Sequence, residues 1–122
     1  MTTLASSDAR FAPAVHSDRL RRAAVAAATR GIDALLITPS HDYAYLLGYA
    51  APAMERLTCL VVPADGPPAL VLPRLEEPLA RHALGELTSG LEILAWDETD
   101  DPTRLVQSLV GSARRVAVQD QM

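Results

Sequence analysis

The sequence contains no lysine, and its eleven basic residues are all arginine. Fifteen acidic residues outnumber them and give a net charge of −4, which argues against a nucleic-acid or anionic-membrane surface. The phosphate-binding loop that ends in Gly-Lys-Ser/Thr is excluded because it requires a lysine, and the sequence has no Gly-x-Gly-x-x-Gly run. The chain therefore carries no recognisable nucleotide-binding motif.

Cysteine, long apolar runs and export signals are also scarce. Cys59 is the single cysteine and cannot form an internal disulfide, and its apolar neighbours predict a buried strand where it acts as a small hydrophobic residue. No apolar run approaches the roughly 20 residues of a membrane span, and the N-terminus lacks the pattern of a signal peptide. We therefore expect a cytoplasmic protein that does not contact membranes.

The chain does contain an alternation of helical and strand patterns, over a length that suits one domain. Residues 1–14 are rich in small and polar residues and are predicted to form a flexible tail, followed by a domain over residues 15–122. Ser17 is predicted to cap a helix over residues 18–30, which Gly31 ends.

Short apolar runs after this helix predict the strands of a sheet. Residues 33–38 form one buried strand, and residues 40–47 form a short helix capped by its first residue, a serine. Residues 57–63 and 69–73 are two further strands, and the Ala-Asp-Gly-Pro turn between them predicts a β-hairpin. A hairpin among strands that alternate with helices indicates a mixed α/β sheet.

The last third of the chain continues the alternation. Residues 75–87 are predicted to be helical with Pro78 in the first turn, and residues 91–96 form a strand. Asp101 is predicted to cap a helix that runs to about residue 113, and residues 115–118 form a final strand. The sequence therefore predicts an α/β fold whose last element is a short strand.

No pattern of catalytic or metal-binding residues is evident. His16, His41 and His82 lie far apart, without the spacing of a metal site, and no Gly-x-Ser-x-Gly motif is present. His41 and Asp42 are adjacent, so their side chains diverge on a helix and do not form a charge-relay pair. The acidic run 97–101 is interpreted as a solvated loop that caps the next helix. We predict no catalytic residue, metal ligand or cofactor in this chain.

Tyr43, Tyr45 and Tyr49 place three of the five aromatic residues within seven positions. Under one interpretation, at least one of them packs beneath the short helix as part of the core. Under the other, Tyr49 projects toward a partner surface. Arg56, which follows this segment, could reach an acidic ligand or partner. The sequence leaves both interpretations open.

The order of these motifs resembles the N-terminal domain of the creatinase/prolidase (Xaa-Pro peptidase) family. The resemblance extends from about residue 15 to residue 120. It is carried by Gly-Ile-Asp-Ala-Leu-Leu-Ile-Thr at 31–38, Tyr-Leu-Leu-Gly-Tyr at 45–49, the hairpin at 57–73, Trp-Asp-Glu at 96–98 and Asp-Pro at 101–102. It implies a ribonuclease H-like α/β fold with a mixed sheet of about five to six strands flanked by helices.

The resemblance also implies a function. Family members hold a dinuclear Mn, Co or Zn centre in a C-terminal catalytic domain, which we expect to be absent from this chain. The chain would then be the non-catalytic N-terminal domain of a Xaa-Pro dipeptidase- or aminopeptidase-like metallopeptidase. Its partners would be its own catalytic domain and a second copy in a homodimer, and it would assist dimerisation and shape substrate access.

The residues expected to contact the substrate entrance or a partner are His41, Tyr45, Tyr49 and Arg56. An alternative is a free-standing ligand-binding or regulatory α/β domain, with a pocket near His41, Tyr45 and Arg56. The reading frame downstream of Met122 separates the two, because only the first interpretation requires a catalytic domain there.

Overall fold

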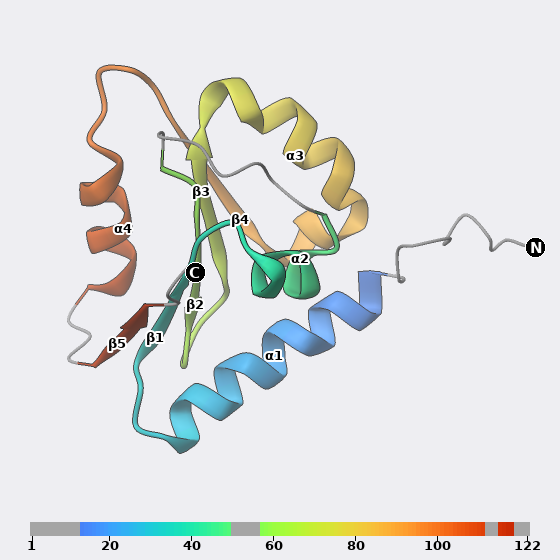
Figure 1. Ribbon diagram of the computed structural model, residues 1–122, viewed down its shortest axis with the longest axis vertical. Helices are drawn as coiled ribbons and strands as arrows, with labels where there is room; N and C mark the ends of the chain where they lie inside the picture. The colour runs from blue at the N-terminus through green and yellow to red at the C-terminus, as the bar shows by residue number, and fades with distance from the viewer. Residues whose placement is uncertain (1–12, 50–56, 112–114, 119–122) are drawn as a thin grey trace, which may run out of the picture.

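The computed structural model describes residues 13–49, 57–111 and 115–118, and Figure 1 shows their arrangement. The elements follow in this order: α1 (Pro13–Thr29), β1 (Ala34–Ile37), α2 (His41–Leu47), β2 (Cys59–Pro63), β3 (Ala69–Pro73), the 3-10 helix η1 (Arg74–Glu76), α3 (Glu77–Leu84), the 3-10 helix η2 (Gly85–Gly90), β4 (Glu92–Trp96), α4 (Pro102–Val110) and β5 (Val116–Val118).

The five strands form one sheet in the order β4-β3-β2-β1-β5. β2 is antiparallel to β1 and β3, whereas β1 pairs in parallel with β5 and β3 with β4. The predicted hairpin of β2 and β3 and the predicted mixed α/β sheet are therefore confirmed. The four strands other than β2 run in one direction, so their carboxyl ends meet at one edge of the sheet.

Helices cover both faces of the sheet, with α1, α2 and α3 on one side and α4 on the other (Figure 1). Successive residues of β2 point to opposite sides: Leu60 and Val62 join a core cluster beneath α1 and α2, while Cys59 and Val61 join a cluster beneath α4. We call these the α1 face and the α4 face. β2 is apolar throughout because both of its faces are covered.

The first helix begins earlier than predicted. It starts at Pro13, so Ser17 is an exposed residue within the helix and the prediction that Ser17 is its N-cap is wrong. A proline is favourable in a first helical turn because its missing N–H has no intrahelical partner there. The predicted end is confirmed, since Gly31 adopts a φ of 74° just beyond the helix.

The helix predicted over residues 75–87 is three shorter elements. η1 comes first, α3 ends at Leu84, and Gly85, with a φ of 57°, begins η2. Pro78 does lie in the first turn of α3, as predicted. The last helix, α4, is capped by the Asp101 side chain and ends at Val110, short of the predicted residue 113. None of the helices in the described ranges has the length and hydrophobicity needed to cross a membrane.

Candidate partner-contact site around helix α2

Helix α2 is short, and residues adjacent to it in sequence cap both of its ends. The Ser40 hydroxyl accepts a hydrogen bond from the Tyr43 N–H at 3.3 Å, as expected of an N-cap. Gly48, with a φ of 80°, donates its N–H to the Ala44 carbonyl at 2.8 Å. The predicted cap and the predicted end of this helix are therefore confirmed.

A pair of tyrosines lies on the inner side of α2. Tyr43 has no exposed surface and donates its hydroxyl to the Tyr49 hydroxyl at 3.1 Å, and the ring centroids lie 5.7 Å apart in an edge-to-face arrangement. Burial is the main cause that raises the pKa of both phenols, and the charge of Glu76 adds to the effect on Tyr49. The core interpretation is confirmed for Tyr43. Tyr49 is half-buried against the same core.

The outer side of α2 is exposed. His41 and Tyr45 are one helical turn apart on this surface, and 54% of Tyr45 is accessible to solvent. The Arg19 guanidinium lies 3.9 Å from the centroid of the Tyr45 ring and donates to the Tyr45 carbonyl at 2.8 Å. This cation–π contact holds an exposed aromatic ring in one orientation.

A second side chain of α1 lies at the same carbonyl. Nδ1 of His16 is 3.2 Å from the Tyr45 oxygen, where a protonated Nδ1 donates, and the imidazole is 5% exposed. The ring lies against Gly48, where a Cβ would come within 2.5 Å of Nε2. Glycine is thus required there for space as well as for φ. Two side chains of α1 therefore contact the C-terminal end of α2, where the helix dipole favours the positive charge of Arg19.

His16 and Arg19 were not predicted as parts of this site. They lie 29 and 26 residues before Tyr45, and no local pattern links such positions. Their three-residue spacing, which places both on one side of α1, was the available signal.

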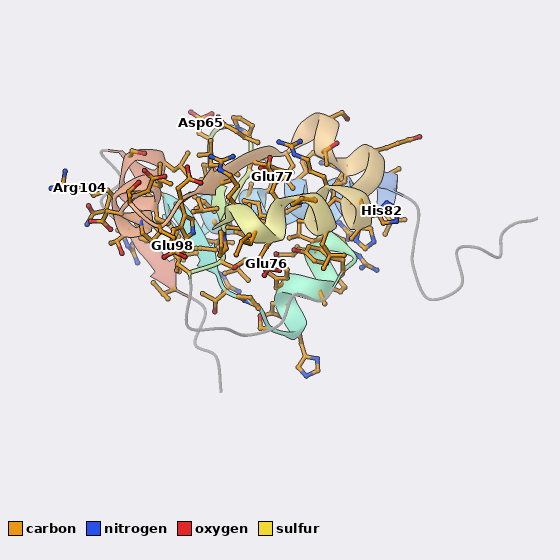
Figure 2. The ribbon with its side chains drawn as sticks, turned by 90° about the horizontal axis from the view of Figure 1, so that it is seen from above. Asp65, Glu76, Glu77, His82, Glu98 and Arg104 are labelled. Carbon is orange, nitrogen blue, oxygen red and sulfur yellow. The ribbon has the colours of Figure 1, made fainter. Side chains whose placement is uncertain are left out.

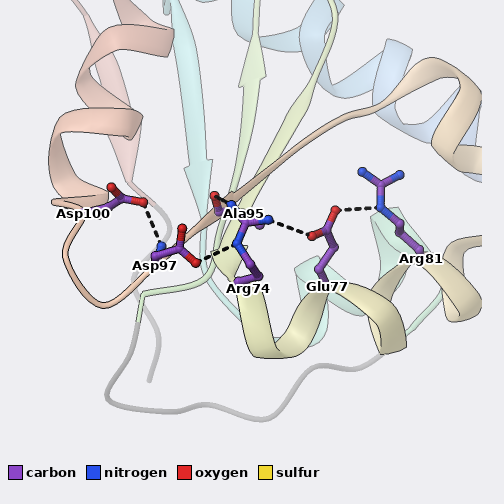
Figure 3. Close-up of polar contacts among 6 residues, drawn as sticks. All are labelled: Arg74, Glu77, Arg81, Ala95, Asp97 and Asp100. Carbon is purple, nitrogen blue, oxygen red and sulfur yellow. Dashed lines mark hydrogen bonds and ion pairs between the residues drawn. The ribbon is translucent and has the colours of Figure 1, made fainter.

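A charged network joins the carboxyl ends of β3 and β4 (Figure 3). Arg74 Nε lies 2.6 Å from Asp97 Oδ1, Arg74 Nη2 donates to the Ala95 carbonyl at 3.3 Å, and Glu77 bridges Arg74 and Arg81. The bond to Asp97 is the main cause that raises the pKa of Arg74. Because these charged groups pair with one another, the network joins the segment after β3 to the segment after β4. It does not indicate a ligand site.

The acidic run 97–101 behaves as predicted. Asp100 accepts the backbone N–H of Asp97 at 2.8 Å, and Asp101 accepts that of Thr103 at 3.1 Å, which caps α4. Figure 2 labels Glu98, which belongs to this run. Among the residues that the structure describes, no three His, Cys, Asp or Glu side chains are grouped so that they could hold a metal ion.

The four predicted contact residues do not lie together in the structure. His41 and Tyr45 share the exposed side of α2, Tyr49 pairs with Tyr43 on the inner side, and Arg56 lies outside the described residues.

Burial raises the pKa of the Cys59 thiol to about 11, so the thiol remains protonated at neutral pH.

A family model described as "Creatinase/Prolidase N-terminal domain" matches residues 19–122. The chain is 47% identical over 115 residues to the probable dipeptidase PepE of Mycobacterium tuberculosis and to that of Mycobacterium bovis. The matched region is 93% of this chain and 30% of each relative, so the chain spans less than a third of their length.

Two solved structures resemble the fold. The crystal structure of dipeptidase PepE from Mycobacterium ulcerans matches with a TM-score of 0.83 and 42% identity, over 93% of this chain and 30% of that one. The creatinase/prolidase N-terminal domain of an X-Pro dipeptidase from Streptococcus pyogenes matches with a TM-score of 0.69 and 18% identity, over 84% of this chain and 80% of that one. The second likeness bears on the fold alone.

Proposed function

The chain belongs to the creatinase/prolidase N-terminal domain family, and we propose that it is the non-catalytic N-terminal domain of a Xaa-Pro dipeptidase-like metallopeptidase. The observation that carries the proposal is the 47% identity to probable dipeptidases of which the chain covers only 30%. A parent protein of comparable length would hold its catalytic residues outside the region compared.

The metal centre of such a parent would also lie elsewhere. A dinuclear site needs several converging carboxylate or imidazole ligands, and the described residues offer no such group. We propose that Mn, Co or Zn is bound in a C-terminal catalytic domain and that no residue described in this chain takes part. The cytoplasm is the proposed location.

Within this parent, the exposed side of α2 is our proposed contact with a catalytic domain, its own or that of a second copy in a homodimer. Tyrosine and arginine are enriched at protein interfaces, and here Arg19 holds the exposed Tyr45 ring in place, which lowers the entropy lost on contact. His41 extends the same surface by one turn. Through this contact the domain would support dimerisation and shape substrate access.

The first experiment measures hydrolysis of Xaa-Pro dipeptides by the 122-residue chain and by the parent protein, each with Mn²⁺ or Co²⁺. We expect turnover by the parent and none above background by the chain. Turnover by the chain alone would show that the catalytic site lies within it and would refute the proposal.

The second experiment tests the α2 contact in the parent. We expect His41→Ala and Tyr45→Ala to raise KM several-fold or to weaken the dimer seen by light scattering, because they remove side chains from the interface. His82→Ala is the matched control, since His82 is exposed but belongs to α3 and not to α2. Equal effects of His41→Ala and His82→Ala would count against a specific role for α2.

A further inference from the structure

A pocket of about 410 Å³ opens between α1 and the amino-terminal ends of β3 and β4. One wall is a stripe of α1 with Leu20, Arg21 and Ala24, spaced so that they share one side of the helix. The opposite wall comes from the hairpin turn between β2 and β3 and from η2, which contributes Leu87 and Gly90. The volume falls within the range of small-molecule sites.

The lining is apolar apart from one charged and one hydroxyl side chain. Leu20, Leu87 and Val62 are almost completely buried at its base, whereas Arg21 and Ser17 stand at its α1 side. An apolar base with one polar side favours a ligand that has an apolar body and a single polar end.

The charge at that polar end is positive. Asp18 pairs with both Arg21 and Arg22, so two guanidinium groups share one carboxylate and one positive charge remains in excess. A guanidinium carries five N–H donors in a planar fork, so the pairing with Asp18 does not exhaust the donors of Arg21. The fork matches a second carboxylate.

We propose that this pocket binds a small aliphatic carboxylate, with its apolar body against Leu20, Val62 and Leu87 and its carboxylate at Arg21. The ligand chemistry can come from a medium-chain fatty acid or from an N-acylated apolar amino acid. The site is separate from the exposed side of α2, because neither His41 nor Tyr45 lines the pocket.

The test is a titration of the isotopically labelled chain with octanoate and, separately, with N-acetyl-leucine, followed by amide NMR and calorimetry. We expect saturable shifts centred on the amides of Ala24, Gly66 and Gly90 with at least one of the two probes. The probe that binds more tightly identifies the source of the ligand. Octylammonium, which has the same apolar body with the opposite charge, should bind at least tenfold more weakly than octanoate.

Two substitutions separate the polar and apolar halves of the site. Arg21→Gln should weaken carboxylate binding about tenfold or more, because a charge-assisted hydrogen bond is lost. Arg30→Gln is its matched control, as Arg30 is exposed in the turn after α1 and does not line the pocket. Gly90→Phe should abolish binding by filling the mouth. A Cβ at Gly90 meets no atom within 4 Å, so the added side chain begins in open space.

Ser89→Phe controls for the added ring, because Ser89 is exposed and does not line the pocket. The proposal is overturned if neither probe shifts these amides, if octylammonium binds as tightly as octanoate, or if Arg21→Gln and Arg30→Gln have equal effects. None of these readouts depends on peptidase activity, so the result stands apart from the proposed role of the domain.

Discussion

The two faces of the sheet differ in how completely they are packed. Among the described residues, the α1 face holds a cluster of thirteen buried side chains beneath several helices, whereas the α4 face holds five beneath α4. Yet the open pocket and the exposed Tyr45 both lie on the α1 side. The larger core therefore belongs to the face that carries the candidate contact and ligand sites.

The two faces also differ in which parts of the structure are held in a fixed position. On the α1 face, Gly48, His16 and Arg19 fix one end of a short helix, so that its outer side chains are presented in a defined orientation. On the α4 face, Trp96 is held by a hydrogen bond from its indole to the Leu57 carbonyl at 3.0 Å, and the other buried side chains of the cluster are three valines and Cys59. Neither of the two proposed sites lies on the α4 face.

The largest expected effect on stability comes from Gly48→Ala, which changes the C-terminal end of α2 on the α1 face. A left-handed φ costs alanine about 1–2 kcal/mol, and the methyl group would also meet the buried His16 ring, which adds about 1–3 kcal/mol. We expect the free energy of unfolding to fall by about 2–5 kcal/mol in urea titrations. Gly90→Ala is the control and should change it by less than about 0.5 kcal/mol. Similar values for the two variants would mean that the His16 contact is not tight.

The next prediction concerns the pH dependence of stability, which a residue of the α4 face is expected to influence. Burial raises the pKa of the Cys59 thiol from 9.0 to about 11, so the unfolded chain loses this proton first as the pH rises. The protonated thiol's contribution to the free energy of unfolding is fully present below pH 9. It is lost as the pH rises toward 11, which lowers the free energy of unfolding by up to about 3 kcal/mol. Chemical denaturation of the wild type and of Cys59→Ala across this interval measures it.

Cys59→Ala should show a shallower decline in stability than the wild type. Tyr43→Phe serves as the matched variant on the α1 face, because burial also raises the pKa of Tyr43 and an ordinary tyrosine begins to titrate about one pH unit higher than a thiol. If the stability of both variants declines with rising pH as steeply as that of the wild type, the alkaline transition arises elsewhere in the chain.

The smallest expected effect is the difference in stability cost between substitutions of two adjacent valines that point to opposite faces. Val61 is fully buried beneath α4, whereas Val62 borders the open pocket on the α1 face. We expect Val61→Ala to cost about 2–3 kcal/mol and Val62→Ala about 1 kcal/mol less, because water can enter the space beside the pocket. Thermal denaturation of the pair measures the difference. A larger cost at Val62 would indicate that the pocket is closed in solution.

Local sequence was sufficient to predict most strands and the caps at Ser40, Gly48 and Asp101, because each cap depends on residues within one helical turn. It failed for the start of α1, since Ser17 is a good cap residue that the chain uses within a helix. It also could not decide which tyrosine is buried, because that depends on how α2 is rotated against the sheet. The pocket was not predicted at all.

The sequence by itself therefore determined the α/β class and the order of elements, because hydrophobic period and turn residues act over a few positions. The family followed from the resemblance of its ordered motifs to a known N-terminal domain. Only the tertiary structure brought Arg74 to Asp97, His16 to Gly48 and Arg19 to Tyr45, over separations of 23 to 32 residues. Such contacts depend on how helices pack across a sheet, and that packing is set by the whole core at once. The candidate contact site and the pocket are products of that packing.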